Sequence, residues 1–319
     1  MGRLPTNALE DHSYARLAAL GRRGHVDAHR QHVRSVDASR EHATTFIDWR
    51  SDIYTVTSSQ TANELPATLH EGEVALGLLD STYSPTVVEL CGELGLDFVW
   101  LDLEHGGPDP WHAPSLEHLL LAAERTGIDP LVRLPDTDPT LVRKALDLGV
   151  RNVFLPRVES AEEVRRAVRS ARFNYDGGPG DRGLAAPRAS RWGLTEDYVE
   201  REDDQTLVGA TIETIESVDA IDEILDVPEL GFVFIGPFDL SVSLGHPGDL
   251  DHPEVEDAVE TVRSAAVDAG VPVGGLGFGM DDVNEKAENG YQLLHLGSTT
   301  GALQHAIEGW LDAFEGERS

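Results

Sequence analysis

Two acidic side chains stand just beyond apolar runs whose length is typical of buried strands. Glu213 follows the apolar run 207–212, and Asp239 comes shortly after the run 232–235. Continuous apolar runs of this length are typical of parallel strands that are covered on both faces. A carboxylate at the end of such a strand needs a countercharge, because burying it alone costs several kcal/mol. A metal ion, an arginine or a helix N-terminus could supply that charge.

The donor atoms at these two positions favour a hard divalent cation. Glu213 and Asp239 offer carboxylate oxygens with no sulfur nearby, a set that suits Mg²⁺ or Mn²⁺, with Co²⁺ as a further possibility, better than structural zinc. Two carboxylates leave coordination positions open, and a bidentate 2-keto acid could fill them while the metal polarises its carbonyl. The alternative is that arginine alone neutralises these acids.

Three further side chains could move protons or bind anions. His105 closes the second apolar run, and histidine is the side chain that most readily exchanges a proton near neutral pH. Asp147 could orient its ring, although a solvated helix position is the alternative. Arg133 ends the third run and could hold a substrate carboxylate or an oxyanion. A structural pairing of Arg133 with Glu213 or Glu104 is the competing interpretation.

These residues belong to a regular alternation of apolar runs with amphipathic stretches. The strand candidates are residues 74–79, 98–103, 131–134, 152–156, 207–213, 232–236, 271–276 and 291–296, and helices are predicted at 84–94, 115–126, 139–148, 161–171 and 215–225. Eight such units predict an α/β fold, a (β/α)8 barrel, more than an open doubly wound sheet. In a barrel of this type the active site lies at the C-terminal ends of the strands.

The connection at residues 173–205 is too long for an ordinary turn. It is rich in glycine and contains Arg182 and Arg188. Long connections in compact domains are usually functional, which predicts a lid whose arginines could neutralise an anionic substrate. A solvated insertion is the alternative.

Residues 1–70 differ from the remainder of the chain. The first 60 residues carry eight arginines, seven acidic residues and five of the 13 histidines, with no sustained strand pattern. This composition is typical of a poorly ordered extension. A regulatory or targeting arm is one alternative, and a true translation start near Val56 or Val74 is another. We therefore assign residues 1–70 to an N-terminal extension and residues 71–319 to the barrel domain.

The charge balance limits the partners that the chain can have. Its 319 residues contain 25 basic and 57 acidic side chains, for a formal net charge of −32. Nucleic acid and anionic membranes would repel such a protein. Only Lys144 and Lys286 are lysines, and this excess of acid predicts a halophilic protein. The single Cys91, the lack of an 18-residue apolar run and the lack of a secretion signal predict a cytoplasmic location.

The lysines also discriminate between aldol mechanisms. A Schiff-base aldolase needs a lysine inside the barrel, whereas Lys144 and Lys286 both fall in predicted helices. An imine route is therefore not expected. If the protein forms a keto-acid carbanion, a metal must stabilise it.

From about residue 73 to residue 314 the chain resembles the HpcH/HpaI aldolase family, the class II pyruvate aldolases typified by 2,4-dihydroxyhept-2-ene-1,7-dioate aldolase. The motifs that carry the resemblance are Asp102-x-Glu-His105, Val132-Arg-x-Pro135, Arg182-Gly, Arg188-Ala-Ser-Arg-Trp192, Ile212-Glu-Thr214 and Gly236-Pro-x-Asp-Leu-Ser241. Each motif is short, but their order and their places at predicted strand ends make the set specific. The resemblance implies a TIM barrel.

The resemblance also implies a role for each strand-end residue. Glu213 and Asp239 would bind the divalent metal, and Arg133 would steady the carbonyl and enolate oxygen of pyruvate. His105, paired with Asp147, would act as the base or activate it through metal-bound water. The implied reaction is reversible cleavage of a 4-hydroxy-2-keto acid to pyruvate and an aldehyde through a metal-stabilised pyruvate enolate. The implied assembly is a homo-oligomer, a hexamer, that exchanges the helix at 300–314.

The remaining candidates concern substrate binding, and include Arg182 of the long connection. Thr211 stands where relatives commonly carry Gln, and it is shorter. Phe238 stands where a small residue is common, so its ring would narrow the pocket while its backbone N–H, next to Gly236, could bind a carboxylate. Leu276 lies among glycines that leave room for a ligand.

Two other functions are compatible with these residues. A CoA-thioester lyase of the malyl-CoA or citramalyl-CoA type would need a basic track for nucleotide phosphates, and the chain offers little beyond the arginines at 173–205. A barrel that binds a keto acid without turnover is the non-enzymatic alternative.

Overall fold

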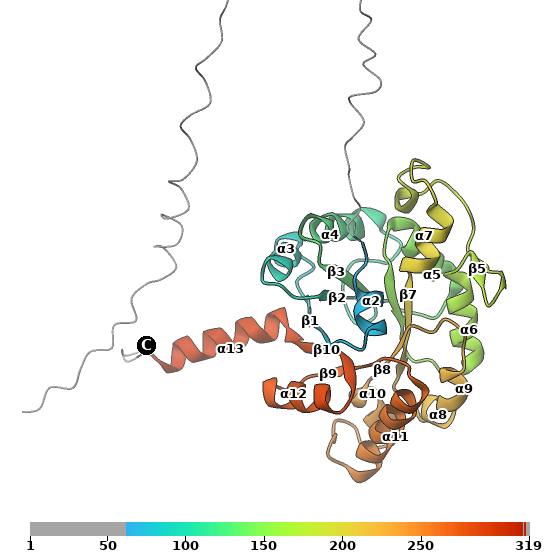
Figure 1. Cartoon of the computed structure of the whole chain (residues 1–319). Helices are drawn as coiled ribbons and strands as arrows, with labels where there is room; N and C mark the ends of the chain where they lie inside the picture. The colour runs from blue at the N-terminus through green and yellow to red at the C-terminus, as the bar shows by residue number, and fades with distance from the viewer. Residues whose placement is uncertain (1–61, 315, 317–319) are drawn as a thin grey trace, which may run out of the picture. The chain divides into compact units, whose positions relative to one another are not determined.

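Eight parallel strands close into a barrel in the computed structural model, which describes residues 62–314 and 316. Around the barrel the order is β1 (Ala75–Leu79), β10 (Tyr291–Ser298), β9 (Val273–Leu276), β8 (Phe232–Ile235), β7 (Leu207–Ile212), β4 (Asn152–Leu155), β3 (Asp129–Arg133) and β2 (Phe98–Asp102) (Figure 1). The predicted (β/α)8 TIM barrel is therefore confirmed. The predicted extension lies, up to residue 61, outside the described residues.

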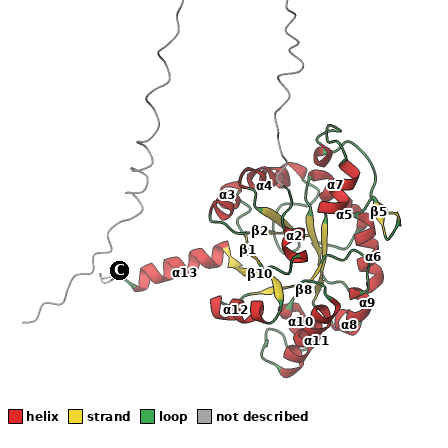
Figure 2. Ribbon diagram, viewed as in Figure 1, coloured by secondary structure: helices red, strands yellow, loops and turns green. Residues whose placement is uncertain are grey.

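Helices connect the strands and cover the outside of the barrel (Figure 2). They are α3 (Pro85–Glu93), α4 (Ala113–Thr126), α5 (Pro139–Leu148), α6 (Ala161–Ser170), α8 (Ile215–Asp219), α9 (Ile221–Leu225), α10 (Pro237–Ser243), α11 (Pro253–Ala269) and α12 (Met280–Glu288). A further helix, α13 (Thr299–Asp312), follows the last strand. The single helix predicted at 215–225 is two short helices that meet at Ala220.

The strands read as continuous apolar runs because each of their faces meets a different core. On β2, Phe98 and Trp100 belong to a cluster inside the barrel, whereas Val99 and Leu101 belong to the cluster between strands and helices. Side chains alternate across a strand, so residues two apart share a face. Every second residue at the C-terminal end of a strand therefore points into the barrel.

A short helix before the first strand closes the N-terminal end of the barrel. In α2 (Leu65–His70), Leu65 and Leu69 are buried in the interior cluster (Figure 1). The Asp129 carboxylate accepts hydrogen bonds from the backbone amides of Glu64 and Leu65, each at 2.9 Å. Leu65 and Leu69 thus pack in the interior of the barrel, although they precede residue 71, where we expect the barrel domain to begin.

We expect Asp129→Asn to stabilise the protein at alkaline pH. Burial raises the pKa of Asp129 from 3.8 to about 7, although the two amides oppose the rise. Between these values the unfolded chain loses the proton and the folded chain keeps it, so the contribution of Asp129 to stability falls as the pH rises. Both amides bond to one oxygen, which an asparagine carbonyl can replace. At pH 8 the variant should gain roughly 2 kcal/mol.

Denaturant unfolding of the wild type and the variant at pH 8 and pH 5 would measure this effect. The gain should shrink at the lower pH, where the wild-type side chain is protonated in the folded state. An equal gain at both pH values would show that ionisation of Asp129 is not its cause.

The long connection at 173–205 docks on the outer helices. It contains the two-stranded β5 (Asn174–Tyr175) and β6 (Gly178–Pro179), a 3-10 turn at Arg188–Ser190, and α7 (Tyr198–Gln205). Arg188 donates hydrogen bonds to the Leu148 carbonyl at 2.9 Å and to Glu124 at 2.8 Å. Leu184, Trp192 and Leu194 remain exposed.

The last helix, α13, extends away from the barrel (Figure 1) and has no buried residue. Its apolar side chains Leu303, Ile307 and Trp310 are all exposed. Their spacing of three and four residues places them on one face of a helix. Within the described residues no helix is long and apolar enough to cross a membrane.

Candidate functional site

A cavity of about 530 Å³ opens at the C-terminal ends of the strands, and we call it the central pocket. It is lined by Leu79, Trp100, His105, Arg133, Thr211, Glu213, Phe234, Gly236, Phe238, Asp239, Leu276, Gly277, Phe278, His295, Gly297 and Ser298. The structure thus brings together most of the side chains predicted from the strand ends. Asp147 and Arg182 are not among the lining residues. The volume is within the range of small-ligand sites.

Glu213 follows β7 and is almost fully buried, with 2% of its surface exposed. Its Oε1 accepts a hydrogen bond from the backbone amide of Arg157 at 2.7 Å. Burial raises the pKa of Glu213 to about 7, the nearby carboxylates of Glu104 and Asp239 add to the rise, and the Arg157 amide opposes it. Gly236 is needed here because a Cβ at that position would lie 2.6 Å from Glu213 Oε2.

Asp239 lies in the first turn of α10, directly after β8. Its carboxylate is partly exposed and lies 3.6 Å from the Arg157 guanidinium, which is itself more than half exposed. An exposed pair at this distance contributes little to stability. Asp239 is therefore free to bind a cation in the central pocket.

Arg133 is held by two acids at the end of β2. Its guanidinium donates to both Asp102 oxygens, at 2.8 and 2.7 Å, and its third nitrogen lies 3.0 Å from Glu104 Oε2. Burial opposes the ionisation of Asp102, but the Arg133 hydrogen bonds and charge hold the pKa of this carboxyl below its usual range. Of the two pairings in the competing interpretation, the one with Glu104 is therefore present, and Arg133 also lines the pocket.

His105 lies at the rim of the pocket. Its side chain is 61% exposed, and Nε2 lies 3.6 Å from Glu104 Oε2. Among the described residues, no hydrogen bond or ion pair joins His105 to Asp147. Asp147 lies on α5 instead, where burial raises its pKa against the charges of Arg182, Lys144 and Arg143. The structure therefore does not bring the expected His105–Asp147 pair together within the chain.

Arg182 is buried away from the central pocket. Its Nη2 donates to Glu202 at 3.0 Å and to the Tyr198 hydroxyl at 3.2 Å, and its guanidinium stacks over Phe173. These contacts join Phe173, at the start of the 173–205 connection, to α7 at its end. The structure thus gives Arg182 a structural role within the chain, and does not place it where the expected substrate contact would need it.

The pocket residues that were not predicted to be functional include Trp100, His295 and Phe278. Trp100 and His295 lie deep in the pocket and Phe278 lies near its mouth. Trp100 is two residues before Asp102, and His295 is two residues before Gly297. The alternation of side chains along a strand was a signal that could have assigned both to the inner face.

The electrostatics of the pocket fit a bound cation. The carboxylates of Glu104 and Asp239 both raise the pKa of Glu213, and Asp239 also raises the pKa of Glu104. Arg133 is the nearest buried cation, and it already pairs with Asp102 and Glu104. Concentrated negative charge and oxygen donors suit Mg²⁺ or Mn²⁺. The residues present therefore fit the predicted metal.

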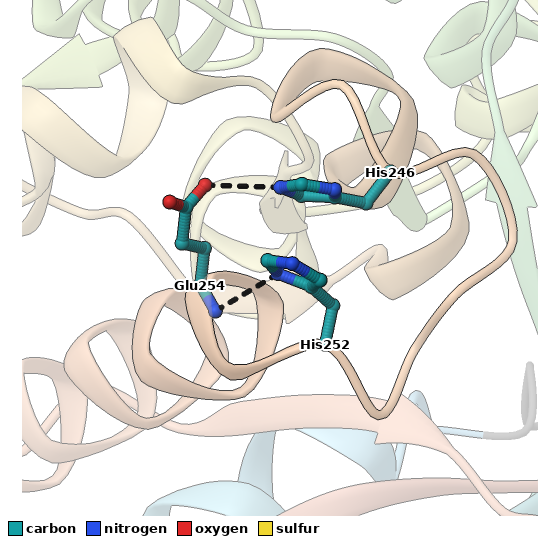
Figure 3. A group of neighbouring side chains, drawn as sticks. All are labelled: His246, His252 and Glu254. Carbon is teal, nitrogen blue, oxygen red and sulfur yellow. Dashed lines mark hydrogen bonds and ion pairs between the residues drawn. The ribbon is translucent and has the colours of Figure 1, made fainter.

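A second group of possible ligands lies outside the pocket, between α10 and α11 (Figure 3). The ligand atoms of His246, His252 and Glu254 lie within 4.8 Å of one another. His252 accepts a hydrogen bond from the Glu254 amide and caps α11, while His246 Nε2 lies 3.0 Å from the Glu254 carboxylate. The two rings stack at 3.4 Å. A metal bonds in the plane of an imidazole, so we interpret this group as a helix cap and not a metal centre.

Comparisons with known proteins agree with this geometry. Residues 76–306 match the HpcH/HpaI aldolase/citrate lyase family. The chain is 32% identical to a hydroxypyruvate/pyruvate aldolase of Paraburkholderia phytofirmans, over 73% of this chain and 90% of that protein. It is 34% identical to a 2-dehydro-3,6-dideoxy-6-sulfogluconate aldolase of Pseudomonas putida, over 76% of this chain and 94% of that protein.

A solved structure shows the same fold. It is an HpcH/HpaI aldolase/citrate lyase family protein from Burkholderia cenocepacia, with a TM-score of 0.74 and 32% identity, covering 78% of this chain and 98% of that chain. The match of family, relatives and barrel confirms the resemblance found in the sequence and the expectation of a lyase. The protein belongs to the HpcH/HpaI aldolase/citrate lyase family and is an enzyme of the class II aldolase type.

Proposed function

We propose that the enzyme catalyses the reversible, metal-dependent cleavage of a 4-hydroxy-2-keto acid to pyruvate and an aldehyde. One observation carries the proposal: Glu213, Asp239, Arg133 and His105 line a single pocket at the C-terminal end of the barrel. Two acids for a cation, a held guanidinium and an accessible imidazole are the groups that this chemistry needs. The curated relatives named above act on keto acids, which supports the same substrate class.

Glu213 and Asp239 would hold the metal. A divalent cation there, Mg²⁺ or Mn²⁺ with Co²⁺ as a substitute, would polarise the keto carbonyl and stabilise negative charge on its oxygen. Arg133 faces the pocket while Asp102 fixes its fork, so it can donate to the same oxygen without reorganising. The backbone N–H of Phe238, at the start of α10, would bind the substrate carboxylate.

His105 is the group that we assign to proton transfer. It is exposed at the rim, where the hydroxyl of an entering substrate can reach it. In the cleavage direction it would remove the proton of the 4-hydroxyl as the bond between C3 and C4 breaks. Asp147 would serve as its partner only if a neighbouring subunit supplied it, because the two residues have no contact within the described part of the chain.

We expect hydrogen–deuterium exchange at the methyl group of pyruvate, which tests the proposal without knowledge of the aldehyde. The full chain in molar salt should exchange these protons with Mg²⁺ or Mn²⁺ and stop when EDTA is added, because only a stabilised carbanion loses them at a useful rate. NMR of the methyl signal measures the exchange. Folded protein that gives no exchange with any of the metals would contradict the proposal.

The thioester lyase is less well supported. Arg133 is the only arginine among the residues that line the central pocket. In the 173–205 connection, Arg182 bonds to α7 and Arg188 bonds to the outer helices. A nucleotide phosphate would need several such groups. We therefore place a small keto acid in the pocket, in a cytoplasmic enzyme that is adapted to high salt.

We also propose that the enzyme is a homo-oligomer, a hexamer by resemblance, whose subunits cover α13. An isolated helix with Leu303, Ile307 and Trp310 exposed along one face would leave a large apolar surface in water. Leu184, Trp192 and Leu194 of the 173–205 connection are exposed as well. Apolar surfaces of this kind are typical of interfaces between subunits.

Trp310→Asp is expected to weaken the assembly strongly. A charge in the middle of a buried apolar face costs several kcal/mol, so dissociation should rise by about a hundredfold or more. Light scattering after size exclusion in molar salt gives the mass. The matched control is Gln304→Asp, a polar position on the same helix. Equal masses for the wild type and Trp310→Asp would argue that α13 is not an interface.

A further inference from the structure

Three buried side chains in the central pocket have polar atoms without a protein partner. The atoms are Trp100 Nε1, Thr211 Oγ1 and both ring nitrogens of His295. None of them makes a hydrogen bond to another described residue. The side chains belong to residues that are 5%, 1% and 8% exposed. A buried polar group without a partner destabilises the protein, because it has lost its hydrogen bonds to water. Three such groups lining one pocket indicate that a ligand satisfies them.

The three side chains lie one inward-facing position below the strand ends. Trp100 precedes Asp102, Thr211 precedes Glu213 and His295 precedes Gly297 by two residues each. The Trp100 and His295 rings meet edge to face with centroids 5.3 Å apart. The Thr211 methyl lies 3.3 Å from the point where a Cβ on Gly236 would stand, and the Glu213 side chain borders the same point. Together they form a floor beneath the proposed metal ligands, which we call the floor subsite.

The side chains of the floor subsite offer uncharged hydrogen-bond donors and acceptors. The indole N–H only donates, a hydroxyl donates and accepts, and a neutral imidazole has one donor and one acceptor. Burial lowers the pKa of His295 to about 4, opposed by a contact with its own backbone carbonyl, so the ring is uncharged at neutral pH. An anion would face the carboxylates of Glu104 and Glu213 with no new cation. A hydroxyl, which both donates and accepts, matches the set.

The remainder of the pocket shows which part of a ligand reaches the floor. Phe238 and Phe278 are about half exposed, and their rings meet at 6.0 Å. An aldehyde arriving after the keto acid would enter past these apolar rings. The keto acid, bound first and closest to Glu213, is the part that lies over the floor. The group that the floor recognises therefore belongs to the keto acid and not to the aldehyde.

We propose that Trp100, Thr211 and His295 form a subsite for a hydroxyl on the carbon next to the keto group of the bound acid. This inference rests on the proposed function and refines its substrate class: the enzyme would prefer a 3-hydroxylated 2-keto acid to its unsubstituted analogue. Hydroxypyruvate and pyruvate are the smallest such pair. They differ by the one hydroxyl that the floor would bind.

The test measures binding without turnover. Full-length protein with saturating Mg²⁺ is titrated with hydroxypyruvate and with pyruvate, followed by ligand-observed NMR. Two hydrogen bonds of about 1 kcal/mol each predict roughly ten- to thirtyfold tighter binding of hydroxypyruvate. Thr211→Val and His295→Leu, which remove the polar atoms, should each lower this ratio at least threefold. Glu254→Gln, a change outside the pocket, should keep the ratio.

The outcomes separate this inference from the proposed function. Equal binding of the two acids by the wild type would overturn the subsite. A preference for hydroxypyruvate that remains in both floor variants would also overturn it, because the metal or an ordered water would then bind the hydroxyl. Circular dichroism checks that each variant is folded. Failure of pyruvate methyl exchange in the wild type would instead refute the proposed function itself.

Discussion

Glu213→Gln is expected to lower the metal-dependent exchange of pyruvate methyl protons by about a thousandfold. Glutamine has nearly the same size, and its carbonyl can still accept the hydrogen bond of the Arg157 amide. What it lacks is the negative charge, and a neutral amide binds a hard divalent cation poorly. Lewis-acid stabilisation of several kcal/mol would be lost, which corresponds to this factor in rate. Asp239→Asn should act in the same direction.

The exchange rate is measured by NMR at saturating Mg²⁺, and Mn²⁺ affinity is measured separately by the EPR signal of the free ion. Glu254→Gln is the matched control, because it removes the carboxylate of the His246–His252 group outside the pocket. It should retain the wild-type rate. If Glu213→Gln kept the wild-type exchange rate and Glu254→Gln lost it, the functional metal would have to be assigned to that second group.

Arg133→Met is expected to lower the free energy of unfolding by roughly 3–5 kcal/mol and to abolish exchange. Methionine fills similar space but leaves Asp102 buried without the two hydrogen bonds that keep it ionised. The pair is well shielded, with side chains 10% and 7% exposed, so the attraction is weakly screened. Denaturant unfolding gives the stability, and pyruvate exchange gives the activity.

A second variant separates the two effects. In Asp102→Asn/Arg133→Met the buried charge is gone, so much of the stability should return. Activity should remain lost, because no guanidinium is available for the keto oxygen. Recovery of both stability and exchange in the double variant would mean that Arg133 only neutralises Asp102 and takes no part in the reaction.

The barrel and most of the pocket could be predicted because their signals are local in the sequence. Apolar runs such as 207–212 set the strands, and a polar residue directly after a strand, such as Glu213, is carried to the C-terminal face by the parallel arrangement. The place of Asp239 in the pocket could be predicted in the same way, because it lies shortly after β8. The prediction of the strand ends needed no knowledge of distant contacts.

The partners of Arg133 and Arg182 could not be chosen from the sequence. An arginine pairs with whichever acid the fold places within a few ångströms, and the acid can be far along the chain. Arg133 meets Asp102, 31 residues earlier, whereas Arg182 meets Glu202 and is withdrawn from the pocket. A guanidinium in a glycine-rich loop looks the same in the sequence whether it faces a substrate or a buried glutamate.

The sequence by itself determined the eight strands, the family and the acids at the pocket, since these depend on periodicity and on short motifs. Only the tertiary structure decided that α2 closes the barrel, that His105 and Asp147 lie apart within the chain, and that Trp100, Thr211 and His295 share one floor. The reason is that these relations join residues from helices and strands that are distant in the sequence. Closure of the barrel and its register, which no local pattern specifies, set their distances.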